Sequence, residues 1–286
     1  MKYTGFLLVL FSSICFGVMP IFATFAYQTG LSVSVVLLFR FLLAAILLNL
    51  YVLIKGYKYP TGKTLIILIM MGGVGYATQS FLYFTALTLI GSSLTAILLY
   101  LYPAIVLLLS IFLLNTKIKK IEIIALILAM IGALLVIGIK FEQMNYIGIL
   151  FGIGAAFVYS IYILAGSKVM QGIHALVGAT VIISSASVVY LLFTLSAHAT
   201  MPATTQQWTW VFAIAMVSGI LAIVTFFSGM KIVGPVKASM ISTFEPVVTV
   251  YLSYLLLHDT ITRYQILGAI LIITAAILIS KEGNHE

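Results

Sequence analysis

Charged residues are scarce in this chain of 286 residues. Asp, Glu, Lys and Arg make up only 7% of it, whereas 63% of the residues are hydrophobic and the mean hydropathy is +1.26. A soluble domain carries about 25% charged residues, so the composition excludes that class. The apolar runs are continuous and do not alternate with polar residues, which excludes a transmembrane barrel. The sequence therefore predicts a polytopic helical membrane protein.

The sequence also offers few residues that could bind a metal ion. The single Cys15 leaves no disulfide framework and no cysteine-based metal site. The four histidines, His174, His198, His258 and His285, lie at predicted helix ends, in loops or in the tail, and no pair has metal-ligand spacing. We therefore expect no metal and no cofactor.

Ten apolar segments have the length of about 20 residues that a bilayer requires. The side that holds the amino terminus carries eleven Lys residues, whereas the other side carries only Lys140 and Arg263. Loops rich in Lys and Arg stay in the cytoplasm, so we expect both termini there, in the cell (inner) membrane. The net charge of +8 then reflects topology, and no nucleic-acid partner is expected. The segments are 4–26, 32–54, 64–87, 93–114, 121–139, 146–166, 174–196, 208–230, 238–257 and 263–280.

The second half of the chain repeats the first. A shift of 143 residues places Gly5 on Gly148, Gly91 on Gly234 and Pro103 on Pro246. Residues 83–137 and 226–280 share 13 identities in 55 positions, without a gap. Five spans is an odd number, so the second half enters the membrane from the opposite side. The predicted fold class is all-α, with ten transmembrane helices as two inverted five-helix repeats, 1–143 and 144–286, and a midplane substrate site between them.

Two charges fall inside predicted spans, and both are candidate site residues. Glu245 lies near the middle of the ninth span and Arg40 within the second. A charge at that depth costs about 2.5–3.5 kcal/mol on insertion scales and marks a functional site by default. Their depths differ by roughly 8 Å at 1.5 Å per residue. Arg40 either holds its helix to a neighbour or meets a substrate carboxylate, and a direct pair with Glu245 stays open.

Further candidates follow from helical spacing. Ser242 and Thr249 share a helical face with Glu245, and Pro246 should bend or loosen the ninth span because it has no N–H to donate to the Ser242 carbonyl. Pro103 is the repeat mate of Pro246 and is a second candidate for a kink. The remaining candidates are aromatic or polar residues in the third, fourth and sixth spans, where packing is an alternative role: Tyr76, Gln79, Tyr83, Tyr102 and Tyr159.

The chain resembles the EamA-type transporters of the drug/metabolite transporter superfamily. The residues that carry the resemblance are Arg40-Phe41, the segments YFTALTLIG (83–91) and FFSGMKIVG (226–234), and Glu245-Pro246. The resemblance implies a ten-helix carrier, often an exporter of amino acids, other metabolites or drugs.

The expected function is therefore secondary-active export of a small metabolite by alternating access. A cation and an anion in one cavity would suit a zwitterion such as an amino acid, with Glu245 binding the amine or a proton. A membrane-embedded enzyme and a channel or lipid translocator remain alternatives, although no nucleophile or zinc motif supports an enzyme. The expected partners are the small-molecule substrate and the lipid bilayer, and the protein is expected to be a monomer or a homodimer.

Overall fold

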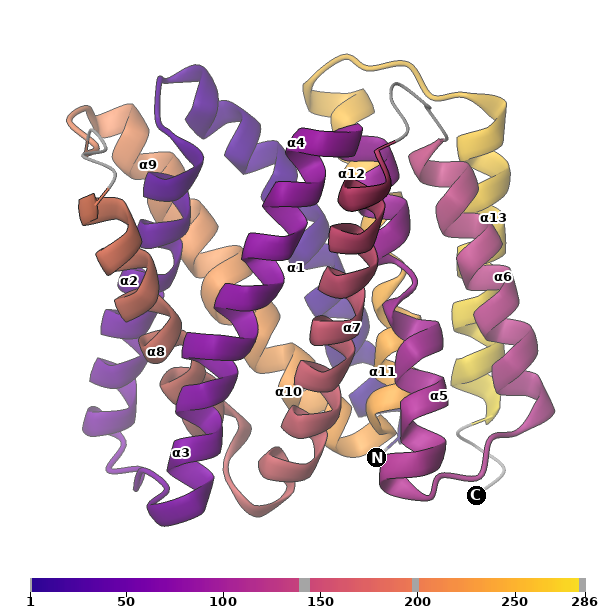
Figure 1. Ribbon diagram of the computed structural model, residues 1–286, viewed down its shortest axis with the longest axis horizontal. Coiled ribbons are helices and arrows are strands. Elements are labelled where there is room, and N and C mark those ends of the chain that lie inside the picture. Colours follow the sequence, from indigo (N-terminus) through magenta and orange to yellow (C-terminus); the bar gives the residue numbers. More distant parts are fainter. Residues whose placement is uncertain (1, 139–144, 197–200, 283–286) are drawn as a thin grey trace.

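The protein is helical throughout the part of the chain that the structure describes. The structure, a computed structural model, describes residues 2–138, 145–196 and 201–282. The expected domain boundary at 143/144 and the residues Lys140, His198 and His285 lie outside these ranges. The elements are α1 (Lys2–Gln28), α2 (Val33–Ile54), α3 (Gly62–Met70), η1 (Met71–Tyr76), α4 (Ala77–Leu99), α5 (Tyr102–Leu114), α6 (Lys120–Ile137), α7 (Tyr146–Val169), η2 (Met170–Gly172), α8 (Ala175–Ser196), α9 (Thr205–Ile214), η3 (Ala215–Leu221), α10 (Ala222–Val233), α11 (Pro235–Ser242), α12 (Glu245–Leu256) and α13 (Arg263–Glu282) (Figure 1).

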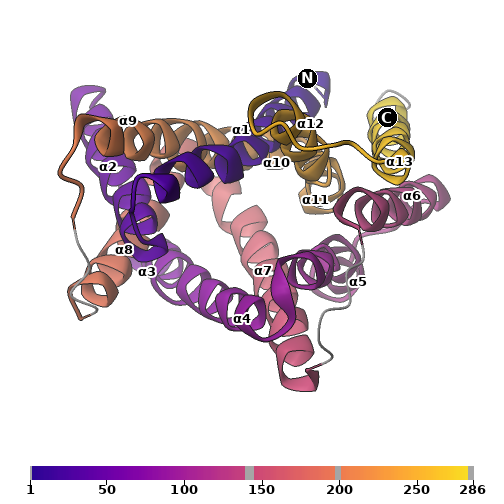
Figure 2. The ribbon, with the colours of Figure 1, turned by 90° about the horizontal axis from the view of Figure 1, so that it is seen from above.

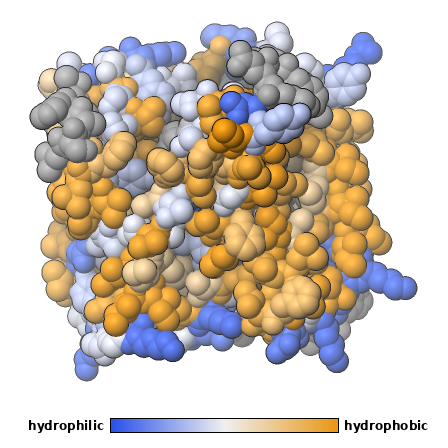
Figure 3. Space-filling model, viewed as in Figure 1, coloured by the Kyte–Doolittle hydropathy of each residue, from blue (hydrophilic) through white to orange (hydrophobic). Residues whose placement is uncertain are grey.

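These elements form ten apolar stretches within the described ranges that are long enough to cross a membrane. The prediction of ten transmembrane helices is confirmed, with ends that differ by a few residues. Their outer surface is apolar over the middle of the molecule, and hydrophilic residues gather along its upper and lower edges (Figure 3). The first helix begins, and α13 ends, at the same edge (Figure 1).

Two spans contain π-helical segments that the sequence analysis did not predict. The third span runs through α3, η1 and α4, and the eighth runs through α9, η3 and α10. Each ends at a glycine with positive φ: Gly91 at φ 74° and ψ 170°, and Gly234 at φ 84° and ψ 164°. That backbone region is essentially restricted to glycine, which explains why both halves carry glycine there.

The fourth and ninth spans are interrupted, and the ninth corrects the prediction of a single bent helix. The ninth span consists of α11 and α12, separated by Thr243 and Phe244. The N–H groups of these two residues bond the carbonyls of Met240 and Ile241, three residues back, which ends α11 in a tight turn. Pro246 stands in the first turn of α12, where a missing N–H costs nothing. Because of this break, Ser242 belongs to a different helix from Glu245 and Thr249.

The fourth span is interrupted in the same way. Leu101 donates its N–H to the carbonyl of Leu98, three residues back, and α5 begins at Tyr102 with Pro103 in its first turn. The two proline candidates thus lie at the starts of α5 and α12, where they begin a new helix and do not kink an existing one.

Helices of one half pack on helices of the other half. Gly5 of α1 contacts Ile232 and Val233 of α10 so closely that an added Cβ would lie 2.7 Å from Ile232 Cβ. Its repeat mate Gly148, in α7, meets Leu89 and Ile90 of α4 in the same manner. In Figure 1, α1 begins at the lower edge and α7 at the upper edge.

The fifth and tenth spans, α6 and α13, form a peripheral pair. They lie together at one end of the molecule, opposite the end that holds α2 and α8 (Figure 2). Gly132 and Gly268 stand where they cross, and a Cβ on either glycine would lie within 2.7 Å of the other's carbonyl oxygen. Ala125, Ala129 and Ala133 are buried, so the small residues of α6 serve packing within the chain.

Candidate functional site

Arg40 lies buried in α2, where its guanidinium is held by both π-helical segments. The side chain is only 2% exposed. It donates from one terminal nitrogen to the Tyr76 hydroxyl of η1 at 3.3 Å, and from the other to the Ser218 carbonyl of η3 at 3.2 Å. Among the described residues its Nε has no hydrogen-bond partner. In this conformation, therefore, Arg40 ties α2 to a helix of each half.

Aromatic rings cover the Arg40 guanidinium. Its central carbon lies 5.0 Å from the centroid of the Phe41 ring and 5.9 Å from that of Phe16 in α1. Aromatic faces attract a cation at this range, which offsets part of the cost of removing it from water. The charge is thus stabilised within the protein and is not positioned to reach the bilayer surface.

Glu245 has a different environment, since it begins α12 directly after the break in the ninth span. The residue is partly exposed. Within the described part of the chain its carboxylate accepts no hydrogen bond and forms no ion pair. Four tyrosine side chains lie within electrostatic range of it: Tyr83, Tyr100, Tyr102 and Tyr159. Within the described residues, therefore, Glu245 differs from Arg40 in having no hydrogen-bond or ion-pair partner.

A continuous series of tyrosine rings joins the surroundings of Arg40 to those of Glu245. Ring centroids lie 6.4 Å apart between Tyr76 and Tyr162, and 6.0 Å apart between Tyr162 and Tyr159. The series continues from Tyr159 to Tyr102 at 4.8 Å and from Tyr102 to Tyr100 at 6.2 Å. The rings come from η1, α7, the start of α5 and the turn before it, so both halves contribute.

Arg40 and Glu245 do not form a direct ion pair in the part of the chain that the structure describes. No ion pair joins them among the described residues, although the two charges interact electrostatically over a longer distance. The two charges are therefore separate groups within electrostatic range of each other in this conformation.

The other candidates are divided between this site and local packing. Tyr102 is buried and donates to the Ser239 carbonyl at 3.2 Å, and the Ser242 hydroxyl lies near its side chain. Thr249 donates to the carbonyls of Gly17 at 2.9 Å and Glu245 at 3.2 Å. Gln79 is the exception, because the described structure gives it only a bond from the neighbouring Ser80 at 3.4 Å and no contact with either charge.

Three residues of the site were not predicted from the sequence. Ser218 binds Arg40 through a backbone carbonyl, which has no side-chain signature. Tyr190 stacks on Phe41 at 5.2 Å, and its buried hydroxyl has no hydrogen-bond partner among the described residues. Gly17 allows α1 to touch the first turn of α12. The sequence repeat offers one signal for Ser218. A shift of 143 residues places Gly75, at the end of the glycine-rich segment 72–75 in η1, on Ser218 in η3.

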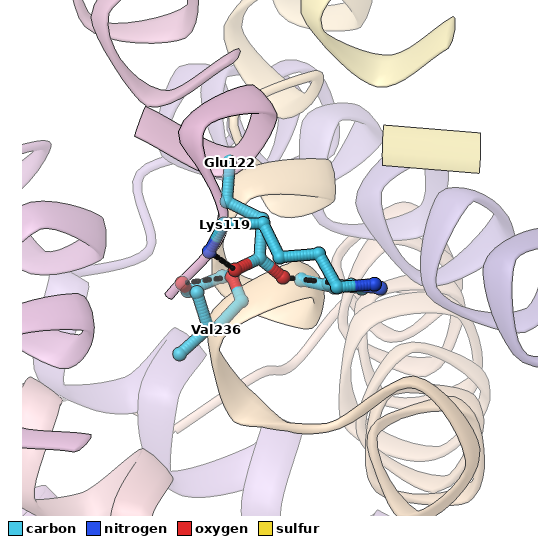
Figure 4. A network of polar contacts seen from close by, with 5 residues as sticks. Lys119, Glu122 and Val236 are labelled. Carbon is cyan, nitrogen blue, oxygen red and sulfur yellow. Dashed lines mark hydrogen bonds and ion pairs between the residues drawn. The ribbon is translucent and has the colours of Figure 1, made fainter. Parts of the chain in front are cut away.

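A second polar network joins the halves outside this site (Figure 4). Glu122, in the first turn of α6, accepts the N–H of Lys119 at 3.1 Å. Its other oxygen lies 3.8 Å from the Nζ of Lys237 in α11, and the two side chains are 8% and 17% exposed. This ion pair therefore crosses from the first half to the second.

The comparisons with known proteins define the class of this molecule. The model of the EamA-like transporter family matches the chain twice, at residues 3–138 and 146–281. The chain therefore belongs to that family, it is a membrane transporter, and the resemblance found in its sequence is confirmed. The two matches also confirm that the chain is built of two repeats.

Individual relatives agree with this class. The chain is 27% identical over 277 residues to the "Uncharacterized transporter YcbK" of Bacillus subtilis (strain 168), covering 92% of this chain and 88% of that protein. A solved crystal structure superposes with a TM-score of 0.84 at 15% identity and covers 100% of this chain and 99% of that one. At this identity the superposition shows the fold alone.

Proposed function

We propose that this transporter is a secondary-active exporter of a small metabolite, an amino acid or related zwitterion, which it moves by alternating access. The observation that carries the proposal is Glu245, which stands at a helix break within electrostatic range of the buried Arg40 and whose carboxylate has no hydrogen-bond or ion-pair partner among the residues that the structure describes. A zwitterion would present its ammonium to Glu245 and its carboxylate toward Arg40. A proton on Glu245 could replace the substrate, which would couple export to the proton gradient.

The two repeats support alternating access. We infer that they are inverted relative to each other, because α1 and α7 begin at opposite edges and their mates Gly5 and Gly148 make corresponding close contacts. Such repeats exchange conformations to open a midplane site first to one side and then to the other. The breaks before Tyr102 and Glu245 provide positions where the backbone can bend.

The orientation in the membrane belongs to the same proposal. With eleven Lys on one side against two basic residues on the other, both termini face the cytoplasm of a cell (inner) membrane. Reporter fusions at the two termini test this: activity of a periplasmic reporter at either end would contradict it.

The transport proposal is tested by untargeted mass spectrometry of the medium around cells that overproduce the protein. The comparison is with Glu245→Gln and with Asp259→Asn, which removes an exposed carboxylate just beyond α12, all at equal abundance in the membrane. A metabolite enriched by the wild type and Asp259→Asn but not by Glu245→Gln supports the proposal. Equal enrichment by the wild type and both variants would show that the Glu245 carboxylate is not needed for transport.

The alternatives predict different results in reconstituted vesicles. A carrier shows saturable counterflow, in which an internal solute accelerates uptake of its labelled copy, whereas a channel does not. A lipid translocator would move a labelled lipid between leaflets, and a membrane-embedded enzyme would convert a labelled lipid into a product.

A further inference from the structure

We infer that Glu245 and the rings of Tyr100, Tyr102 and Tyr159 form an ammonium-binding subsite that recognises an organic cation through ring faces as well as the carboxylate. This inference rests on the proposed function for its role in transport, and it adds the chemical class of the group that is bound. The ligand needs an ammonium group, which is either primary or methylated. A carboxylate on the ligand contributes less to binding at this subsite.

The placement of the rings carries the inference. Tyr102 and Tyr159 lie with ring centroids 4.8 Å apart at an interplanar angle of 68°, and Tyr100 lies 6.2 Å from Tyr102 at 41°. Rings at such angles do not stack flat against one another, so their faces point in different directions. Cations bind over ring faces within about 6 Å of the centroid, and cages of this kind bind quaternary ammonium groups.

The elements that flank Glu245 hold two of these rings beside it. Tyr102 donates to the carbonyl of Ser239 in α11, the helix that ends just before Glu245. Tyr100 shares an apolar cluster with Phe244 and Val247, which lie on either side of Glu245 in the chain. Tyr159 reaches the same place from α7, where Ser160 donates to the Tyr102 carbonyl at 3.1 Å.

The contrast between the two charges gives the subsite its selectivity. Both terminal nitrogens of Arg40 are engaged and its side chain is 2% exposed, so it contributes little to a carboxylate in this conformation. The Glu245 carboxylate has no hydrogen-bond donor within the described residues and is partly exposed. An incoming ammonium therefore gains more here than an incoming carboxylate.

The test is a binding measurement on the purified full chain in nanodiscs with four labelled probes that share a phenylethyl skeleton. The probes are phenethylamine, its N,N,N-trimethyl derivative, phenylalanine and 3-phenylpropanoate. We expect the two cations and the zwitterion to bind and the anion to bind at least about tenfold more weakly. The trimethyl cation donates no hydrogen bond, so we expect its affinity to stay within about threefold of phenethylamine if ring faces hold it.

Variants separate the ring face from other roles of tyrosine. Tyr159→Phe keeps the face and should retain cation affinity, whereas Tyr159→Leu should weaken it about 3- to 30-fold. Phe157→Leu is the matched control, because Phe157 stands two residues before Tyr159 on α7 and its side chain is exposed. Glu245→Gln should weaken every ammonium probe, and thermal unfolding shows whether each variant is folded.

The results that overturn the inference differ from those that overturn the proposed function. Binding of 3-phenylpropanoate as tight as that of phenethylamine, loss of the trimethyl cation, equal affinities of Tyr159→Leu and wild type, or no binding of any probe each refutes the subsite. Counterflow of an exported metabolite in the same preparations would then still support the transporter. Cation binding as expected without counterflow of any probe or metabolite would leave the subsite and refute the export function.

Discussion

Replacing Gly17 with alanine should push α1 away from the first turn of α12, where Glu245 stands. An added Cβ would lie 2.7 Å from the Glu245 carbonyl oxygen and 2.7 Å from Val248 Cβ. Neither atom can move alone, since one is backbone and the other is fixed to α12. The hydrogen bond from Thr249 to the Gly17 carbonyl, 2.9 Å long, holds the same contact and should lengthen.

The expected cost follows from two opposing effects. Overpacking a well-packed contact costs typically about 1–3 kcal/mol, whereas alanine in a helix interior is favoured over glycine by roughly 0.5–1 kcal/mol. The net loss of about 1–2 kcal/mol corresponds to a 5- to 30-fold change in the folding equilibrium. At about 2–4 °C per kcal/mol for a chain of this order of size, the unfolding midpoint should fall by several degrees.

Gly154→Ala is the matched control on α7. Its Cβ would meet the side chain of Leu82, with Cδ1 at 3.4 Å and Cδ2 at 3.9 Å, which is ordinary contact, so this variant should be neutral or slightly stabilised. Thermal unfolding of the purified proteins, followed by counterflow in vesicles, measures both effects. Equal midpoints for Gly17→Ala and Gly154→Ala would refute the close contact of α1 with α12.

Three other changes test the surrounding structure. Arg40→Lys removes the planar guanidinium that donates to the Tyr76 hydroxyl and the Ser218 carbonyl together. Because a charge-assisted hydrogen bond is worth about 1.5–3 kcal/mol, the unfolding midpoint should fall. An unchanged midpoint would show that Arg40 does not join α2 to η1 and η3. Glu122→Gln and Lys237→Met should show a coupling of about 0.5–3 kcal/mol in a double-mutant cycle, whereas additive effects would show that the ion pair does not join the halves. Gly234→Ala should cost about 1–3 kcal/mol because its φ is 84°; a midpoint equal to the wild type's would show that this conformation is not required.

The extent of the spans could be predicted from the sequence because the bilayer imposes a length and excludes charge. The repeat of Gly91 on Gly234 and of Pro103 on Pro246 also marked positions where both halves have special backbone structure. The π-helical segments and the breaks could not be predicted, because they depend on which carbonyl accepts each N–H. The glycines at 72, 73 and 75 mark the first π-helical segment as unusual in composition, but composition does not fix which carbonyl each N–H will bond.

The site was predicted in its charges but not in their roles. Depth in the membrane singled out Arg40 and Glu245, and helical spacing found Tyr76 and Tyr159. Tyr102 was a candidate because it directly precedes Pro103. What separates the two charges is that Arg40 is bound by a backbone carbonyl from residue 218, while Glu245 lies within electrostatic range of tyrosines that are far away in the chain. Gln79 shows the limit of spacing: it lies near Tyr76 in sequence, yet no contact in the described structure joins it to the ring series.

The crossed contacts of Gly5 and Gly148 have a consequence for how the protein is made. The groove on α4 that receives Gly148 is complete before α7 has been synthesised, and α1 waits for α10, more than 190 residues later in the chain. The first five helices therefore leave two matching surfaces uncovered, one on α1 and one on α4. A half produced alone would cover both surfaces by pairing with a second copy of itself about a two-fold axis, since α1 of each copy would then meet α4 of the other.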